Sequence, residues 1–289
     1  MPVTVAGTTT AQFTMPGMSN LPLSGPPQLR IEGARAILQL QRPAHHNRIE
    51  ADDLPHLQSQ LAAVQADLAL RVLVLTGSGD ASFCSGYNLA TLTELGADMA
   101  AASTATSAAA PTAAPTLDGV IDQLEHLRLP TICALNGSVY GGGTDLALAC
   151  DFRIGVEGSR LVMPATRIGL HYYANGMRRY VERLGVANAK RLFLLGESVP
   201  AEELLAMGYL TALVPPAQLQ ATMDALAERL GGNPPTVTQD MKRHLNALAS
   251  GQFDAAAITR DHRKSLASTD LREGLQAMRE QRPPKFSGG

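Results

Sequence analysis

The sequence predicts an α/β protein with a mixed core of strands and helices and an all-helical region at its C-terminal end. Three observations support this prediction. Residues 71–76 are predicted to form a strand whose apolar run VLVL shows no alternation, as expected of a strand that is covered on both faces in a parallel sheet. Residues 52–68, before that strand, repeat leucine and valine at helical spacing, so strand, helix and strand follow one another as in βαβ units. After residue 215, two apolar stripes recur at helical spacing and no further strand is expected.

The elements divide into three regions. Residues 1–28 contain no Lys or Arg and several Pro, Gly, Ser and Thr, which predicts a poorly ordered extension rather than a signal or transit peptide. Residues 29–215 are expected to form the α/β core, and residues 216–289 the helical region. Within the core, residues 100–116 consist only of Ala, Thr, Ser and Pro. We expect a neutral surface insertion there, with a lid over a ligand site as the alternative.

Composition excludes several classes of function. The chain has 289 residues, 45% of them hydrophobic, and a net charge of -2, which argues against a dedicated nucleic-acid or membrane-surface binder. The sequence contains no run of about eighteen apolar residues, so no transmembrane helix is expected. Three cysteines without a CxxC pair favour a reducing compartment, so a cytoplasmic location is expected. No His, Cys or carboxylate spacing predicts a metal site.

Two glycine-rich loops predict an anion-stabilising site. Gly141, Gly142 and Gly143 lie between a strand candidate and a helix-compatible run, so free backbone N–H groups meet the positive end of a helix dipole. The loop FCSGYN turns at Ser85-Gly86 and is expected to present the N–H of Tyr87 toward the N–H of Gly142. Two such amides on one carbonyl oxygen form an oxyanion hole, in which one donor contributes roughly 3 to 4 kcal/mol to transition-state stabilisation.

The segments RVLVLTGSGDASFCSGYNL and ALNGSVYGGGTDLALACDFRI resemble the two signature regions of the enoyl-CoA hydratase/isomerase (crotonase) family. The similarity covers about residues 29–286. It implies a crotonase-like spiral of ββα repeats, followed by an all-helical C-terminal trimerisation region that assembles trimers, often paired into hexamers. It also implies a small-molecule acyl-CoA substrate, no cofactor beyond the coenzyme A of that substrate, and an oxyanion hole made by Tyr87 and Gly142.

The sequence departs from the family pattern at both catalytic glutamates. The first glutamate position, two residues after the triple glycine, is Asp145, which keeps a carboxylate for proton transfer but shortens its reach by about 1.5 Å. The alternative is that Asp145 serves only the start of its helix. The second glutamate position, after a proline, is Ala165, which cannot act as an acid or a base. Neither a two-glutamate hydratase mechanism nor a simple isomerase mechanism at that position is available.

The segment HYY offers replacement groups. Tyr173 lies at the position where some hydrolytic or dehalogenating members of the family carry a catalytic aspartate, and His171 and Tyr172 flank it. Histidine is suited to proton transfer near neutral pH, and a tyrosine can donate a hydrogen bond. The alternative for each residue is packing under the cleft, but we expect at least one of the three to contact substrate.

Four further residues match positions near coenzyme A. The resemblance implies that His45 and His46 lie near the CoA moiety, although Ala44 stands where many relatives have a phosphate-contacting lysine. It also implies that Arg282 and Lys285 reach the CoA phosphates of a neighbouring subunit, with solvated side chains of an exposed tail as the alternative. Ala165 is expected to line the substrate site, and Cys84 to be a small packing residue rather than a nucleophile.

These observations rank three hypotheses of function. The first is an enoyl-CoA hydratase or isomerase, a lyase or an isomerase by class, that acts through an oxyanion-stabilised thioester enolate with an atypical acid/base set. The second is a crotonase-fold hydrolase or C–C bond-cleaving enzyme of the acyl-CoA or β-diketone type, which Ala165 favours. The third is a catalytically degenerate structural subunit, which the missing glutamate favours and the intact glycines oppose.

Overall fold

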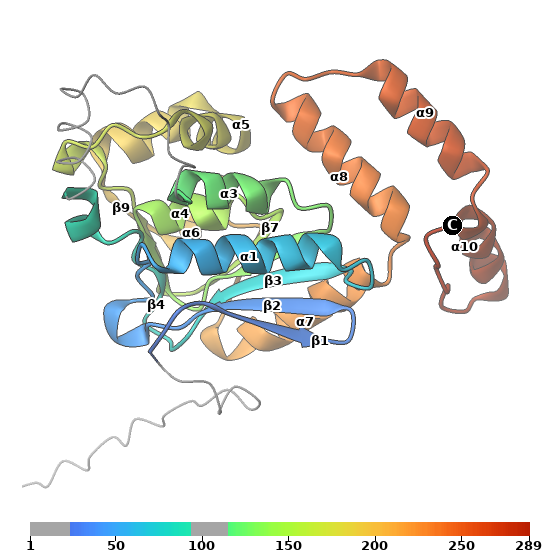
Figure 1. Cartoon of the computed structure of the whole chain (residues 1–289), viewed down its shortest axis with the longest axis horizontal. Coiled ribbons are helices and arrows are strands. Elements are labelled where there is room, and N and C mark those ends of the chain that lie inside the picture. Colours follow the sequence, from blue (N-terminus) through green and yellow to red (C-terminus); the bar gives the residue numbers. More distant parts are fainter. Residues whose placement is uncertain (1–23, 94–114) are drawn as a thin grey trace, which may run out of the picture.

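The computed structural model describes residues 24–93 and 115–289 (Figure 1). Most of the predicted N-terminal extension, 1–28, and almost all of the predicted insertion, 100–116, therefore lie outside the described residues. The rest folds into two sheets with helices around them, and the alternation of strand and helix that the sequence predicts over the core is confirmed.

The larger sheet is built mainly from parallel strands. Its six strands, in spatial order, are β1 (Gln28–Glu32), β2 (Arg35–Leu40), β3 (Val72–Gly77), β5 (Thr131–Ala134), β7 (Phe152–Val156) and β10 (Ala212–Val214). Only the β1–β2 pair is antiparallel. All six residues of β3 are buried, which confirms the prediction from its unbroken apolar run.

The smaller sheet receives one short strand after each of three strands of the larger sheet. Its order is β4 (Ser82–Cys84), β6 (Ser138–Tyr140), β8 (Arg160–Val162) and β9 (Ser198–Pro200). The chain thus runs from β3 to β4, from β5 to β6 and from β7 to β8, which is the repeat of the predicted spiral. Since β4, β6 and β8 are parallel neighbours, their carboxyl ends meet at one edge of the sheet.

Helices cover both faces of the larger sheet. On one face α1 (Asp53–Ala66), α3 (Leu117–Glu125) and α4 (Gly142–Leu148) share a core with β3, and on the other α7 (Leu219–Gly231) packs against β2, β3, β5 and β7. Val72 and Val74 face α7, whereas Leu73 and Leu75 face the opposite core. α5 (Ala174–Lys190) follows β8 and packs on α3 and α4, and α6 (Ala201–Ala206) follows β9.

The C-terminal region contains α8 (Pro235–Ala249), α9 (Ala255–Leu266) and α10 (Thr269–Glu280), which lie to one side of the sheets in Figure 1. α8 exposes Met241, Leu245 and Leu248, which recur at helical spacing on one face. Among the described helices, none is both long and apolar enough to cross a membrane.

Candidate active site

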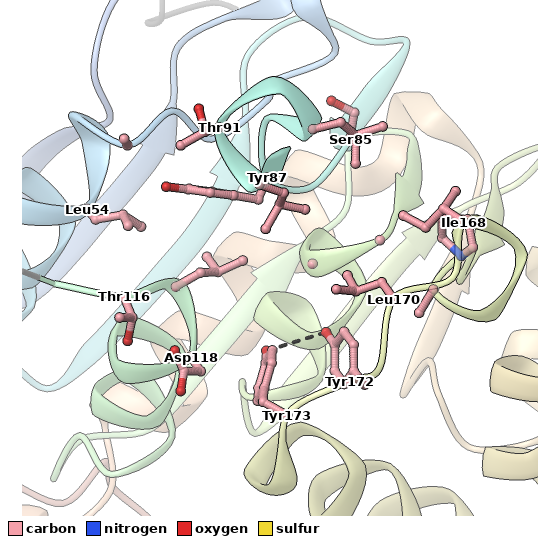
Figure 2. Close-up of a pocket in the computed structure, with 18 of the residues that line it drawn as sticks. Leu54, Ser85, Tyr87, Thr91, Thr116, Asp118, Ile168, Leu170, Tyr172 and Tyr173 are labelled. Carbon is pink, nitrogen blue, oxygen red and sulfur yellow. Dashed lines mark hydrogen bonds between the residues drawn. The ribbon is translucent and has the colours of Figure 1, made fainter. Parts of the chain in front are cut away.

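The carboxyl ends of β4, β6 and β8 open onto one cavity of about 700 Å³. Each strand contributes the residues that follow it: Ser85 and Tyr87 after β4, Gly141 and Gly142 after β6, and Met163 to Ala165 after β8. Figure 2 shows side chains from α1, α3 and the segment before α5 closing the cavity from the other sides. Its walls are mainly apolar, with Leu54, Leu89, Leu92, Leu117, Ile168 and Leu170 among the lining residues.

The two glycine loops touch each other at the cavity wall. A Cβ atom placed on Gly142 would lie 3.7 Å from the Tyr87 amide nitrogen, and one on Gly86 would lie 2.9 Å from the Gly142 amide nitrogen. Gly86 has φ +90° and Gly141 φ +50°, so both turns need glycine. Among residues 24–93 and 115–289, neither the Tyr87 nor the Gly142 N–H donates to a protein acceptor. Both amides are therefore free for a ligand oxygen.

The segment around His45 and His46 holds the first loop in place. The Ser85 N–H donates to the His46 carbonyl at 2.8 Å, and the Ile49 N–H donates to the Gly86 carbonyl at 2.9 Å. The Ser85 hydroxyl also donates to the His45 carbonyl at 3.2 Å. Neither histidine side chain is among the residues that line the cavity, and His46 Nδ1 instead contacts the Ser82 hydroxyl at 2.9 Å. The coenzyme A contact predicted for them stays a prediction.

Asp145 lies behind the cavity wall. Its side chain is 0% exposed on α4 and is not among the lining residues. One carboxylate oxygen, Oδ2, accepts a hydrogen bond from Arg179 Nη1 at 2.7 Å and another from the Tyr173 hydroxyl. Burial raises the pKa of Asp145, while the positive charge of Arg179 opposes that shift. Asp145 therefore reaches a bound molecule only through Tyr173.

Arg179 belongs to a buried network between α3 and α5. Besides Asp145 it contacts Asp122 at 2.7 Å and Glu125 at 3.2 Å, and its own side chain is fully buried. Arg178 pairs with the same Glu125 at 2.6 Å. The network fixes the carboxylate of Asp145 against the start of α5, which is where Tyr173 precedes the helix.

The HYY segment brings three polar side chains to the cavity. Tyr172 and Tyr173 stack with ring centroids 4.4 Å apart, and both line the cavity (Figure 2). Burial, and next the negative charge of Asp145, raise the pKa of Tyr173, so its hydroxyl stays protonated near neutral pH. His171 also lines the cavity, and its Nδ1 lies 2.8 Å from the Tyr172 carbonyl oxygen. That carbonyl can only accept, so Nδ1 carries a hydrogen in this contact.

Ala165 lines the cavity at the start of the turn Thr166–Ile168, and its methyl group brings no proton chemistry. Cys84 lies under Gly86 and accepts a hydrogen bond from the Gly86 N–H at 3.3 Å. Burial raises the pKa of the Cys84 thiol to about 12, which suits a packing residue. No group of His, Cys, Asp and Glu side chains in the described parts of the chain could hold a metal ion.

Arg282 and Lys285 lie after α10, at the far end of Figure 1 from the N-terminal ends of α1 and α3. Arg282 pairs with Glu273 at 2.7 Å and with Glu280 at 2.6 Å. Within one chain these two residues are not brought to the cavity. A contact with the coenzyme A of a neighbouring subunit stays a prediction.

Sequence reasoning missed most of the apolar wall and two acidic residues of the cavity, the exposed Asp52 and, deeper in the chain fold, Asp118. Asp118 is half-buried near the start of α3 and lines the same cavity, and Figure 2 draws it on the α3 side, beside Tyr173 in that view. It follows a low-complexity stretch and belongs to no motif, so no spacing in the sequence singles it out. Only the packing of α3 against the glycine loops places it there.

The spiral of paired strands and the two amides at one cavity define a protein of the crotonase fold. Comparison with known families agrees: the model of the enoyl-CoA hydratase/isomerase family matches residues 30–289. The chain belongs to this family.

Individual relatives cover most of the chain at modest identity. Crotonyl-CoA hydratase of Syntrophomonas wolfei is 28% identical over 260 residues, which are 89% of this chain and 96% of the relative. (E)-benzylidenesuccinyl-CoA hydratase of Thauera aromatica is 29% identical over 268 residues, 91% and 99% of the two chains. The crystal structure of enoyl-CoA hydratase from Bacillus anthracis superposes with a TM-score of 0.79 at 27% identity, covering 92% of this chain and 100% of the other.

Proposed function

We propose that this protein transforms acyl-CoA thioesters through an enolate, by hydrating an enoyl-CoA or by moving its double bond. One observation carries the proposal: the free amides of Tyr87 and Gly142 meet at the wall of a large apolar cavity. Two donors fixed at one point stabilise the negative charge that develops on a thioester oxygen when an enolate forms. The apolar walls suit an acyl chain, and coenzyme A enters as part of the substrate.

Proton transfer at this site runs through Tyr173. Its hydroxyl donates to Asp145 and its oxygen accepts a hydrogen bond from the Tyr172 hydroxyl at 3.4 Å, which leaves one lone pair of the Tyr173 oxygen for a bound molecule. A substrate proton passes to the Tyr173 oxygen while the tyrosine's own proton passes to Asp145 Oδ2, and the reverse steps return it. Tyr173 stays neutral at both ends of this relay. Asp145 holds the proton, and the raised pKa of Asp145 favours that protonated state.

A second candidate is hydrolysis or C–C bond cleavage of an acyl-CoA or β-diketone. Ala165 supports it, because the second family glutamate of water addition is missing from the cavity. A catalytically degenerate structural subunit is the third candidate.

A panel of enoyl-, 3-hydroxyacyl- and β-ketoacyl-CoA thioesters, analysed by mass spectrometry, distinguishes the three candidates. Hydration adds one water to the thioester and isomerisation leaves the mass unchanged with a shifted double bond. Hydrolysis releases free acid and coenzyme A. If no thioester of the panel reacts, and calorimetry detects no binding of coenzyme A thioesters, the proposed function is contradicted.

We also propose that the chain assembles into trimers, or hexamers of paired trimers. The exposed apolar face of α8, formed by Met241, Leu245 and Leu248, supports self-association through the C-terminal helices. In such an assembly Arg282 and Lys285 of one subunit could lie near the cavity of the next.

A further inference from the structure

We propose that Asp118 is a second catalytic carboxylate of this site and that it activates the water that adds to an enoyl-CoA. The inference rests on the proposed function and deepens it. Hydration needs two groups, one that exchanges a proton with the α-carbon and one that takes a proton from water. The Tyr173–Asp145 relay supplies the first, and Ala165 cannot supply the second.

The position of α3 brings Asp118 to the oxyanion hole. A Cβ atom on Gly142 would lie only 2.7 Å from Cδ2 of Leu117, so the first residue of α3 packs directly on the glycine that offers its amide. Asp118 is the next residue, and it lines the same cavity as Tyr87 and Gly142. In the view of Figure 2 it lies below Tyr87, on the same edge of the cavity as Tyr173 and Tyr172.

Within the described residues, the arginines of α5 pair with Asp122 and Glu125 of α3 and not with Asp118. Asp118, Asp122 and Glu125 lie on one face of the helix by their spacing of four and three residues. Asp122 is held by Arg179 and by Asn175, and Glu125 by Arg178 and Arg179. Across residues 24–93 and 115–289, Asp118 has neither a hydrogen bond nor an ion pair. Of these three acidic residues, Asp118 is the one that lines the cavity.

The chemistry balances with these groups. An oxygen of Asp118 takes a proton from water as the water oxygen bonds to the β-carbon. The electron pair of the double bond moves to the thioester oxygen, which the Tyr87 and Gly142 amides stabilise. The α-carbon then takes a proton from the Tyr173 hydroxyl, which is refilled from protonated Asp145. At the end of the cycle solvent takes the proton from Asp118 and returns one to the Tyr173 oxygen, whose own proton passes to the buried Asp145.

The test separates water addition from proton exchange. Wild type, Asp118→Asn, Asp118→Glu and the exposed-charge control Asp80→Asn are assayed on two reactions. The first is hydration of straight-chain and aryl enoyl-CoA thioesters. The second is exchange of the α-hydrogen of the matching saturated acyl-CoA in D2O, followed by mass spectrometry. The second reaction needs the oxyanion hole and the relay but no added water.

We expect Asp118→Asn to lower kcat for hydration by about 10²- to 10⁴-fold, with α-hydrogen exchange within about threefold of wild type. Asp118→Glu is expected to recover part of the hydration rate, and Asp80→Asn all of it. Hydration by Asp118→Asn within about tenfold of wild type would overturn the inference, as would an equal loss of both reactions. If the wild-type protein neither binds an acyl-CoA nor exchanges its α-hydrogen, the proposed function itself is wrong.

Discussion

Tyr173 is the residue on which the proposed chemistry depends most directly. It is in contact with the cavity, whereas the carboxylate it serves is sealed behind it in a network with Arg179. A buried carboxylate and guanidinium in contact are costly to separate, so Asp145 keeps its place whether or not substrate is bound. The Tyr173 hydroxyl thus connects the buried carboxyl group of Asp145 to a molecule bound in the cavity.

We predict that Tyr173→Phe lowers kcat by about 10²-fold or more while KM changes little, because the hydroxyl acts in the proton transfer and the ring still packs on Tyr172. The measurement is steady-state kinetics on the best substrate of the panel. Tyr140→Phe, on a side chain that does not line the cavity, serves as the control. If kcat of Tyr173→Phe is within a few-fold of wild type, the proton does not travel through this hydroxyl.

The cysteines allow a prediction about reactivity and pH. Cys84, Cys133 and Cys150 are all buried, and the pKa of Cys84 is raised from 9.0 to about 12. We expect the folded protein to react slowly with a thiol reagent at about pH 8, and all three thiols to react in guanidinium chloride. Because the folded pKa of Cys84 exceeds the unfolded one, its contribution to stability is complete below pH 9.0 and is lost as the pH rises toward about 12. Rapid labelling of Cys84 in the native protein would contradict this account.

At the scale of elements, the two glycine turns decide whether the amides converge. Gly86 has φ +90°, and a Cβ atom there would meet the Gly142 nitrogen at 2.9 Å. The parallel pairing of β4 with β6 brings the two loops that follow these strands side by side.

We predict that Gly86→Ala lowers kcat/KM by about 10²- to 10³-fold, the effect of losing one oxyanion donor. Gly158→Ala is the matched control, since Gly158 has a similar φ of +78° but nothing within 4 Å of a Cβ atom. It reproduces the backbone strain without the collision. Equal losses in the two variants would show that strain, rather than blocked amides, is responsible.

The strands, the helix periodicity and both glycine turns were predictable from the sequence, because their signals are local. The apolar run of β3 by itself indicates a buried strand, and Gly86 and Gly141 by themselves indicate tight turns with positive φ. The arrangement of the proton-transfer groups of the site could not be predicted from the sequence. The burial of Asp145 depends on Arg179, which is 34 residues away, and the cavity position of Asp118 depends on where α3 packs. No short motif records either contact.

At the scale of the whole molecule, the C-terminal helices expose apolar surface that a single chain leaves uncovered. Leu245 on α8 is 65% exposed and Met241 61%. Burying such side chains contributes roughly 1.5 to 3 kcal/mol each, so contacts of this kind at every interface of the proposed trimer would together stabilise it.

We predict that Leu245→Glu shifts the protein from trimer or hexamer to smaller species, measured by size-exclusion chromatography with light scattering. Leu68→Glu, at a side chain that is 79% exposed outside the helical region, is the control and should leave the mass unchanged. A wild-type protein that is monomeric at micromolar concentration would contradict the proposed assembly.

The order of β4, β6 and β8 in the small sheet separates two tasks along the chain. The residues after β4 and β6 carry the two backbone amides and the buried Asp145, whereas the polar side chains of the HYY segment that line the cavity follow β8 within one continuous segment, Met163 to Tyr173. Evolution can therefore exchange the chemistry of the site by rewriting one short stretch of sequence, with the thioester oxygen held as before. Exchanging that segment between relatives is therefore a way to engineer the reaction, and the start of α3 is the second region in which to make substitutions.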